Sequence, residues 1–182
     1  MKRTPNRTKR QSRLARPRAA SPAGAAPPAV NSKPAFVLRP AQRGDVVAVA
    51  ALDERVTALP KPTHWLELYE RQKKVGQPAG MFLVATTSDA AARFLGFIVG
   101  EIRAWEFGSA PCGWVYALSV DPDSRLLGVG EALLESIARE FRKAGVSKMR
   151  TMVARDNRLP MLFFRGAGMM AGPYIQLEKD LG

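Results

Sequence analysis

The sequence predicts one α/β domain built on a mixed sheet. Three observations predict it: apolar stretches of strand length recur from Phe36 onward, helical patterns alternate with them, and 46% of the 182 residues are apolar. The expected order is strand, two helices, three strands, helix, strand, helix, strand. We expect this domain to occupy residues 36–182, behind a disordered basic tail of residues 1–35.

The first 35 residues differ in composition from the rest of the chain. They hold nine Lys and Arg, no Asp or Glu, and too few large apolar residues to offset the entropy cost of ordering. The net charge of +12 therefore resides mostly in this tail, since 19 basic and 16 acidic residues follow it. A solvated tail is the favoured interpretation. Contact with nucleic acid, binding to an acidic membrane surface and an organelle transit peptide are the alternatives.

The first half of the domain has the patterns of a strand, two helices and two further strands. Asp45 is a candidate helix cap, and a second helix follows Thr63 and ends near Gly76. The later of the two further strands is apolar on both faces, as expected in the middle of a sheet. The three predicted strands are Phe36–Pro40, 81–86 and 93–105.

The second half has the patterns of strand, helix, strand, helix and strand. Its long helix carries apolar residues along one side and ends at Gly145. The last strand alternates at Ile175, Leu177 and Lys179. The predicted ranges are 114–120, 130–144, 148–154, 158–165 and 174–181.

A loop that joins a strand to the long helix predicts an anion site. The strand ends at Asp121-Pro122, and Arg125, Gly128 and Gly130 follow before the helix begins. Backbone N–H groups at a helix N-terminus lack partners inside the helix, and glycines let a phosphate approach them closely. Arg125 adds a fixed positive charge. The loop therefore favours a phosphate or pyrophosphate ligand.

Two other phosphate motifs do not fit this loop. A P-loop requires Lys after its last glycine, and Glu131 stands there. The dinucleotide pattern G-x-G-x-x-G/A fails at Leu133, and it belongs near the start of a doubly wound sheet. The remaining pattern is R-x-x-G-x-G.

This pattern resembles the acetyl-CoA-binding motif of the GNAT superfamily of N-acetyltransferases. The stretch ALSVDPDSRLLGVGEALL is similar to that family's fourth strand, pyrophosphate loop and third helix. Asn157, the pair Phe163-Phe164 and Gly168-Met169 follow at family spacing, and YIQLEKDL resembles its last strand. The resemblance covers residues 36–182. It implies a mostly antiparallel sheet that splays between its fourth and fifth strands.

The resemblance also implies where acetyl-CoA binds. The backbone of Leu118, Ser119 and Val120 would pair with the pantetheine amides, and a backbone N–H of that strand would polarise the thioester carbonyl. Asn157 would contact the pantetheine or position the fourth helix, and Phe164 would lie beside it. The N–H groups that would hold the pyrophosphate belong to Arg125, Leu126, Leu127, Gly128, Val129, Gly130 and Glu131.

The catalytic residues are less clearly marked in the sequence. Phe164 stands where many relatives carry a Tyr that protonates the leaving thiolate. The thiolate then leaves unaided, or another donor such as Tyr116 or Tyr174 replaces that Tyr. For the base that takes a proton from the amine, Glu101 has the best position. The further candidates for this base are Tyr116, Glu106, Ser119 and His64.

The sequence thus predicts transfer of an acetyl group from acetyl-CoA to a primary amine, by direct attack in a ternary complex. The rival is a non-catalytic acyl-CoA-binding module of the same fold, which Phe164 favours. One cysteine and one histidine speak against a metal site. No apolar run is long enough to span a bilayer, and we expect a cytoplasmic protein. The amine acceptor is unidentified, and a homodimer is possible.

Overall fold

The computed structural model describes residues 35–74 and 81–182, and its strands form one sheet in the order β1-β2-β3-β4-β5. Neighbouring strands are antiparallel except β4 and β5, which are parallel. The predicted α/β class, with a mixed and mostly antiparallel sheet, is confirmed. The predicted tail lies outside the described residues apart from Ala35.

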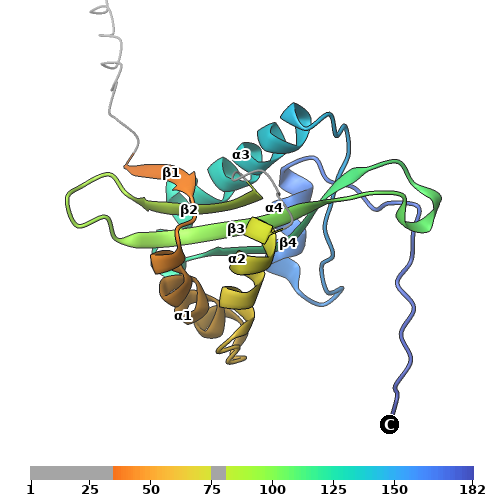
Figure 1. Ribbon diagram of the computed structural model, residues 1–182, viewed down its shortest axis with the longest axis horizontal. Helices are drawn as coiled ribbons and strands as arrows, with labels where there is room; N and C mark the ends of the chain where they lie inside the picture. The colour runs from red at the N-terminus through yellow and green to blue at the C-terminus, as the bar shows by residue number, and fades with distance from the viewer. Residues whose placement is uncertain (1–34, 75–80) are drawn as a thin grey trace, which may run out of the picture. The chain divides into compact units, whose positions relative to one another are not determined.

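The elements follow the predicted order as far as the last helix (Figure 1). The strands are β1 (Phe36–Pro40), β2 (Phe82–Thr87), β3 (Phe94–Arg103), β4 (Cys112–Val120) and β5 (Met149–Arg150). The α-helices are α1 (Val46–Thr57), α2 (His64–Lys74), α3 (Val129–Lys143) and α4 (Arg158–Gly166). A 3-10 turn at Pro122–Leu127 joins β4 to α3.

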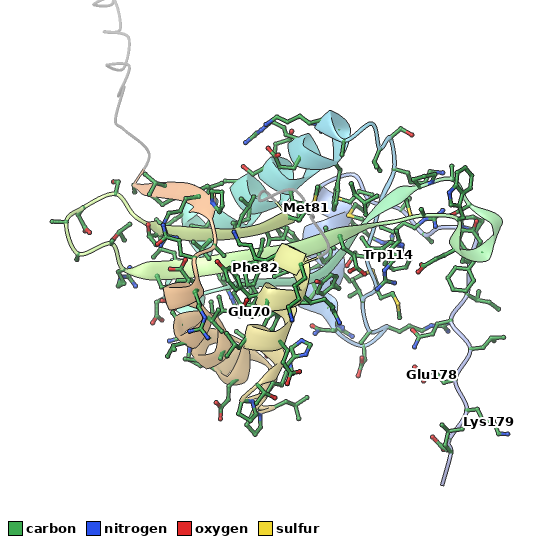
Figure 2. All side chains as sticks on the ribbon, viewed as in Figure 1. Glu70, Met81, Phe82, Trp114, Glu178 and Lys179 are labelled. Carbon is green, nitrogen blue, oxygen red and sulfur yellow. The ribbon has the colours of Figure 1, made fainter. Side chains whose placement is uncertain are left out.

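Helices cover both faces of the sheet, and each face has its own core. On one face α3 buries Leu133, Ile137 and Phe141 against the strands. On the other face α1 and α2 pack around Trp65 and Phe97. The alternation of strand side chains feeds both cores, since the neighbours Met81 and Phe82 belong to opposite ones (Figure 2).

A buried carboxylate fixes α2 against α1. Asp53 accepts hydrogen bonds from Lys61 Nζ at 2.6 Å and from Trp65 Nε1 at 3.1 Å. Both donors reach the same oxygen, so the end of α1, the connecting loop and the start of α2 are held together. The prediction that the Asp45 side chain caps α1 is wrong, because that side chain makes no capping hydrogen bond to the helix. Its carboxylate instead accepts from the N–H of Gln42, at 2.7 Å.

Two predicted strands differ in the structure. The strand expected at 148–154 is reduced to Met149–Arg150, because the chain leaves β4 after that point. The strand expected at 174–181 is wrong: this segment has no strand partner among the described residues, and Ile175 and Leu177 are exposed. Figure 2 shows its Glu178 and Lys179 on an extended stretch. An alternating pattern of apolar and polar residues makes a segment amphipathic, but a β-strand also needs an adjacent strand with unpaired N–H and C=O groups.

Candidate functional site

Strand β4 carries one extra residue opposite β3. Val99 pairs with Ala117 and Gly100 pairs with Val115, so Tyr116 has no partner across the ladder. Such a bulge places two successive residues on the same side of a strand. Val115 therefore packs into the α3 core, whereas Ala117 joins the core under α1 and α2. The hydroxyl of Tyr116 also faces α2, where it contacts Gln72.

Strands β4 and β5 are joined only at one end. The ladder consists of Gly113 with Met149 and Trp114 with Arg150, and Thr151 Oγ1 then donates to the carbonyl oxygen of Val115 at 2.7 Å. Within the described residues, no pairing with β5 extends to residues 116–120. The far edge of β4, at the predicted pantetheine residues Leu118, Ser119 and Val120, therefore has no neighbouring strand.

The predicted phosphate loop forms the corner between β4 and α3. Gly128 has φ of +73°, a left-handed conformation that only glycine adopts without strain. It occupies the N-cap position of α3, and no side chain caps the helix there. Among the described residues, no side chain accepts a hydrogen bond from the first N–H groups of α3, those of Val129, Gly130 and Glu131. Arg125 is exposed on the preceding turn, which also contains Leu126 and Leu127.

Helix α4 packs against the first turn of α3. A Cβ atom at Gly130 would lie 3.1 Å from the ring of Phe163, so this glycine permits the close approach of the two helices. Phe163 and Phe164 contact each other edge to face, and both pack against the α3 core. Asn157 occupies the N-cap position of α4, although its side chain makes no capping hydrogen bond.

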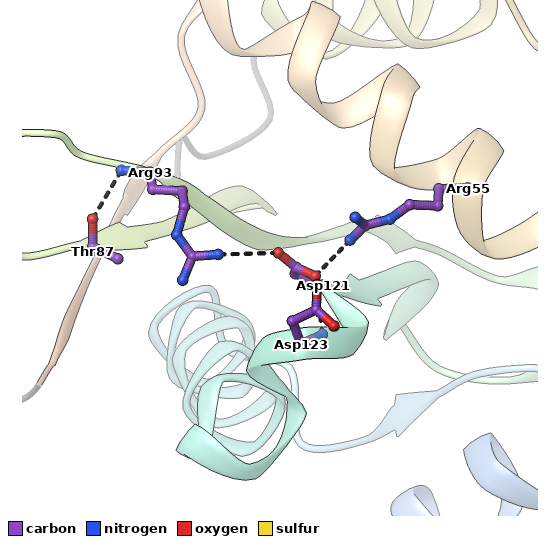
Figure 3. A network of polar contacts seen from close by, with 5 residues as sticks. All are labelled: Arg55, Thr87, Arg93, Asp121 and Asp123. Atoms are coloured by element: carbon purple, nitrogen blue, oxygen red, sulfur yellow. Dashed lines mark hydrogen bonds and ion pairs between the residues drawn. The ribbon is translucent and has the colours of Figure 1, made fainter.

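Asp121 anchors the start of the loop (Figure 3). Its carboxylate accepts from Arg55 at 2.6 Å, from Arg93 at 3.3 Å and from the N–H of Asp123 at 3.1 Å. Burial alone would raise the pKa of Asp121, but the Asp123 N–H and the two guanidinium groups outweigh it and lower the pKa below 3.8. The loop is thereby tied to α1 and to the residue that precedes β3.

Replacement of Asp121 separates its two roles. Asp121→Ala removes the cap and the ion pairs, and we expect it to lower the free energy of unfolding by about 1–2 kcal/mol. Asp121→Asn keeps an acceptor for the Asp123 N–H and should lose less than about 1 kcal/mol, because both arginines are more than half exposed. Urea unfolding at pH 7 measures both values.

The same pair of proteins tests the sign of the pKa shift. A lowered pKa contributes stability above the unfolded value, and that stability is lost as the pH falls through the folded value. The advantage of the native protein over Asp121→Asn should therefore be present at neutral pH and vanish in acid, below 3.8. A difference that persists unchanged at pH near ~2 would contradict this.

A polar cluster formed by Gln72, Glu101, Arg103 and Tyr116 lies on the α2 side of the sheet, beside the bulge. Arg103 Nε donates to Glu101 Oε1 at 2.6 Å, and its guanidinium lies 4.9 Å from the centre of the Trp114 ring. Burial and the nearby charge of Glu101 raise the pKa of Tyr116 to about 12, although Gln72 and Arg71 oppose this. At neutral pH the phenol of Tyr116 therefore keeps its proton.

Several candidates from the sequence lie apart from this cluster. His64 begins α2 with its ring 5.0 Å from that of Trp65, which is buried in the core. Tyr174 contacts Phe107 and Arg150 instead. Sequence reasoning missed Gln72, because a single buried glutamine in a helix has no motif.

Comparisons with known proteins identify the family and the fold. A family model described as the acetyltransferase (GNAT) family matches residues 46–169. Mycothiol acetyltransferases of Kocuria rhizophila and Saccharomonospora viridis are 29% and 31% identical over 107 and 104 residues. These matches cover 57% and 56% of this chain, but only 35% and 33% of the relatives, so the chain matches about a third of their length.

Solved structures share the fold. The aminoglycoside N-acetyltransferase AAC(6')-Iy, solved in complex with CoA, has a TM-score of 0.70 at 15% identity, over 84% of this chain and 99% of that one. Ard1 from Thermoplasma volcanium has a TM-score of 0.61 at 21% identity, over 74% and 82%. In the part of the chain that the structure describes, no helix has the length and apolarity needed to cross a membrane. The family match spans well over half of the sequence, and the chain belongs to the GNAT family of acetyltransferases.

Proposed function

We propose that this chain transfers an acetyl group from acetyl-CoA to a primary amine. The observation that carries the proposal is the corner at Gly128: an uncapped helix N-terminus follows a left-handed glycine and adjoins the unpaired edge of β4. The free helix N-terminus can bind a pyrophosphate, and the unpaired edge of β4 can pair with an extended chain of amides. Pantetheine diphosphate presents both groups.

The loop and the edge of β4 would bind different parts of acetyl-CoA. The N–H groups from Arg125 to Glu131 would hold the pyrophosphate, with the Arg125 guanidinium beside it. The backbone of Leu118, Ser119 and Val120 would pair with the pantetheine. The thioester would then lie near the bulge at Tyr116, where the two strands part. Phe164 packs against the α3 core and has no proton to give.

The polar cluster beside the bulge supports direct attack by the amine. Glu101 would accept a proton from the amine nitrogen, and Tyr116 would protonate the sulfur as the C–S bond breaks. Proximity within the ternary complex supplies much of the rate. One of the solved structures that share the fold is an aminoglycoside N-acetyltransferase, which favours an amine acceptor and puts amino sugars in the first panel to test.

The proposal is tested by release of CoA from acetyl-CoA, followed with a thiol reagent. The panel is neamine, spermidine, lysine and a peptide with a free N-terminus. With the amine that reacts fastest, Tyr116→Phe should lower kcat about 100-fold and change KM for acetyl-CoA less than about twofold. Because the pKa of Tyr116 is about 12, kcat of the native protein should not fall between pH 7 and about pH 10.

A second candidate is a non-catalytic module that binds acyl-CoA. Phe164 favours it, because the family's usual donor position has no hydroxyl. Calorimetric binding of acetyl-CoA without release of CoA from any panel amine would support this candidate. Absence of binding would overturn both.

A further inference from the structure

Gln72 lies buried between two oxygen atoms of the polar cluster. It is 8% exposed, and its Nε2 lies 2.8 Å from the carbonyl oxygen of Gly100 and 3.2 Å from the hydroxyl oxygen of Tyr116. Gly100 adjoins the register shift in β3, opposite the bulge. The side chain thus joins α2 to both strands at the point where their register changes.

The two contacts determine the direction of both hydrogen bonds. A backbone carbonyl only accepts, so the atom facing Gly100 must be the amide nitrogen of Gln72. That nitrogen carries two hydrogens, and the second is directed to the Tyr116 oxygen. In this bond Tyr116 is the acceptor, and its own hydrogen is not used by Gln72.

We infer that Gln72 is a positioning residue that leaves the hydroxyl hydrogen of Tyr116 free for the leaving group. The inference rests on the proposed acetyl transfer. Glu at position 72 would act in the opposite sense, because a carboxylate accepts the phenol proton and cannot donate to Gly100. The Gln72 amide nitrogen can donate one hydrogen to the Gly100 carbonyl and the other to the Tyr116 oxygen at the same time.

The proton balance of the step is complete without a further reagent. As the amine nitrogen bonds to the acetyl carbon, its proton passes to Glu101. As the C–S bond breaks, the sulfur takes the electron pair and the proton of Tyr116. The Gln72 N–H stabilises the resulting phenolate until a proton returns to it through water from Glu101. Amine and thioester become amide and thiol.

A double-mutant cycle tests whether Gln72 acts through Tyr116. The proteins are Gln72→Met, Tyr116→Phe and the double variant, assayed for kcat with acetyl-CoA and the fastest amine among neamine, spermidine, lysine and the peptide. Gln72→Met should lower kcat about tenfold with KM for acetyl-CoA unchanged, and the double variant should be no slower than Tyr116→Phe alone. Additive losses would indicate a merely structural role and overturn the inference. Tyr69→Phe, on the same helix, is the matched control and should keep native kcat.

A second measurement needs no acceptor. The chain has three tyrosines, so Tyr69→Phe with Tyr174→Phe leaves Tyr116 as the only phenol, which can be replaced by the more acidic 3-fluorotyrosine and titrated by fluorine NMR. Loss of a donor to the phenolate should raise the titration midpoint in Gln72→Met. A lowered or unchanged midpoint would show that Gln72 does not donate and would overturn the inference.

The two measurements separate failure of the inference from failure of the proposed function. If the native protein releases no CoA with any panel amine while the midpoint rises, the transfer reaction is refuted, and with it the catalytic use of the bond. If CoA is released and the cycle is additive, only the role of Gln72 is refuted.

Discussion

Gly128→Glu is expected to weaken binding of acetyl-CoA at least about 100-fold, or about 2.8 kcal/mol. Two effects add. A residue with a Cβ atom is strained at φ of +73°, so the corner before α3 should shift. The new carboxylate would also stand where the proposed pyrophosphate meets the positive end of the helix. Calorimetric titration of acetyl-CoA into both proteins measures the difference.

Gly145→Glu is the matched control for this substitution. Gly145 has φ of +77° and follows the other end of the same helix, and a Cβ atom added there would meet no atom within 4 Å. The substitution therefore introduces the same strain and the same charge away from the proposed phosphate site. We expect native affinity for acetyl-CoA. Equal weakening by both substitutions would show that helix strain, and not the loop, controls binding.

Gly113→Ala is expected to lower the free energy of unfolding by about 2–3 kcal/mol. A Cβ atom at this position would lie 2.4 Å from the ring of Phe141, which is buried in the α3 core. Neither the strand nor the ring can move away without disturbing its neighbours. Urea unfolding monitored by circular dichroism measures the loss.

Two further variants show whether this clash is the cause. Gly166→Ala adds the same methyl group to α4 with no atom within 4 Å, and it should stabilise by up to about 1 kcal/mol because alanine favours helix. Phe141→Leu in the Gly113→Ala background should cost less than the sum of the two single changes. Additive costs would mean that α3 does not lie this close to β4.

The sequence predicts the loop well because its determinants are local. Gly128 and Gly130 are required by a left-handed turn and by the close approach of Phe163, and Asp121-Pro122 marks the start of the turn. The turn at Gly128 and its start at Asp121-Pro122 depend on residues a few positions apart, whereas the need for a glycine at 130 comes from Phe163 on α4 and follows only from the fold. Local constraints leave a recognisable pattern in one sequence, and Gly128 lies at the corner between β4 and α3.

The polar cluster beside the bulge could not be predicted in the same way. Gln72 meets Gly100 and Tyr116 from 28 and 44 residues away, and no local spacing records such contacts. The segment 174–181 shows the opposite failure: its local pattern is clear, but a strand depends on a partner that pattern does not specify. The sequence predicts Glu101 as a candidate base, whereas its pairing with Arg103 follows only from the fold.

The unpaired residue in β4 also constrains how this strand can change over time. Before it, odd-numbered residues such as Val115 point toward α3, and after it, even-numbered residues such as Leu118 do. Loss of any one residue between these halves would restore regular pairing and remove the phenol beside Gln72 from its place. An insertion or deletion in β4 would therefore reverse the facing of every residue beyond it, whereas a substitution changes the contacts of one residue.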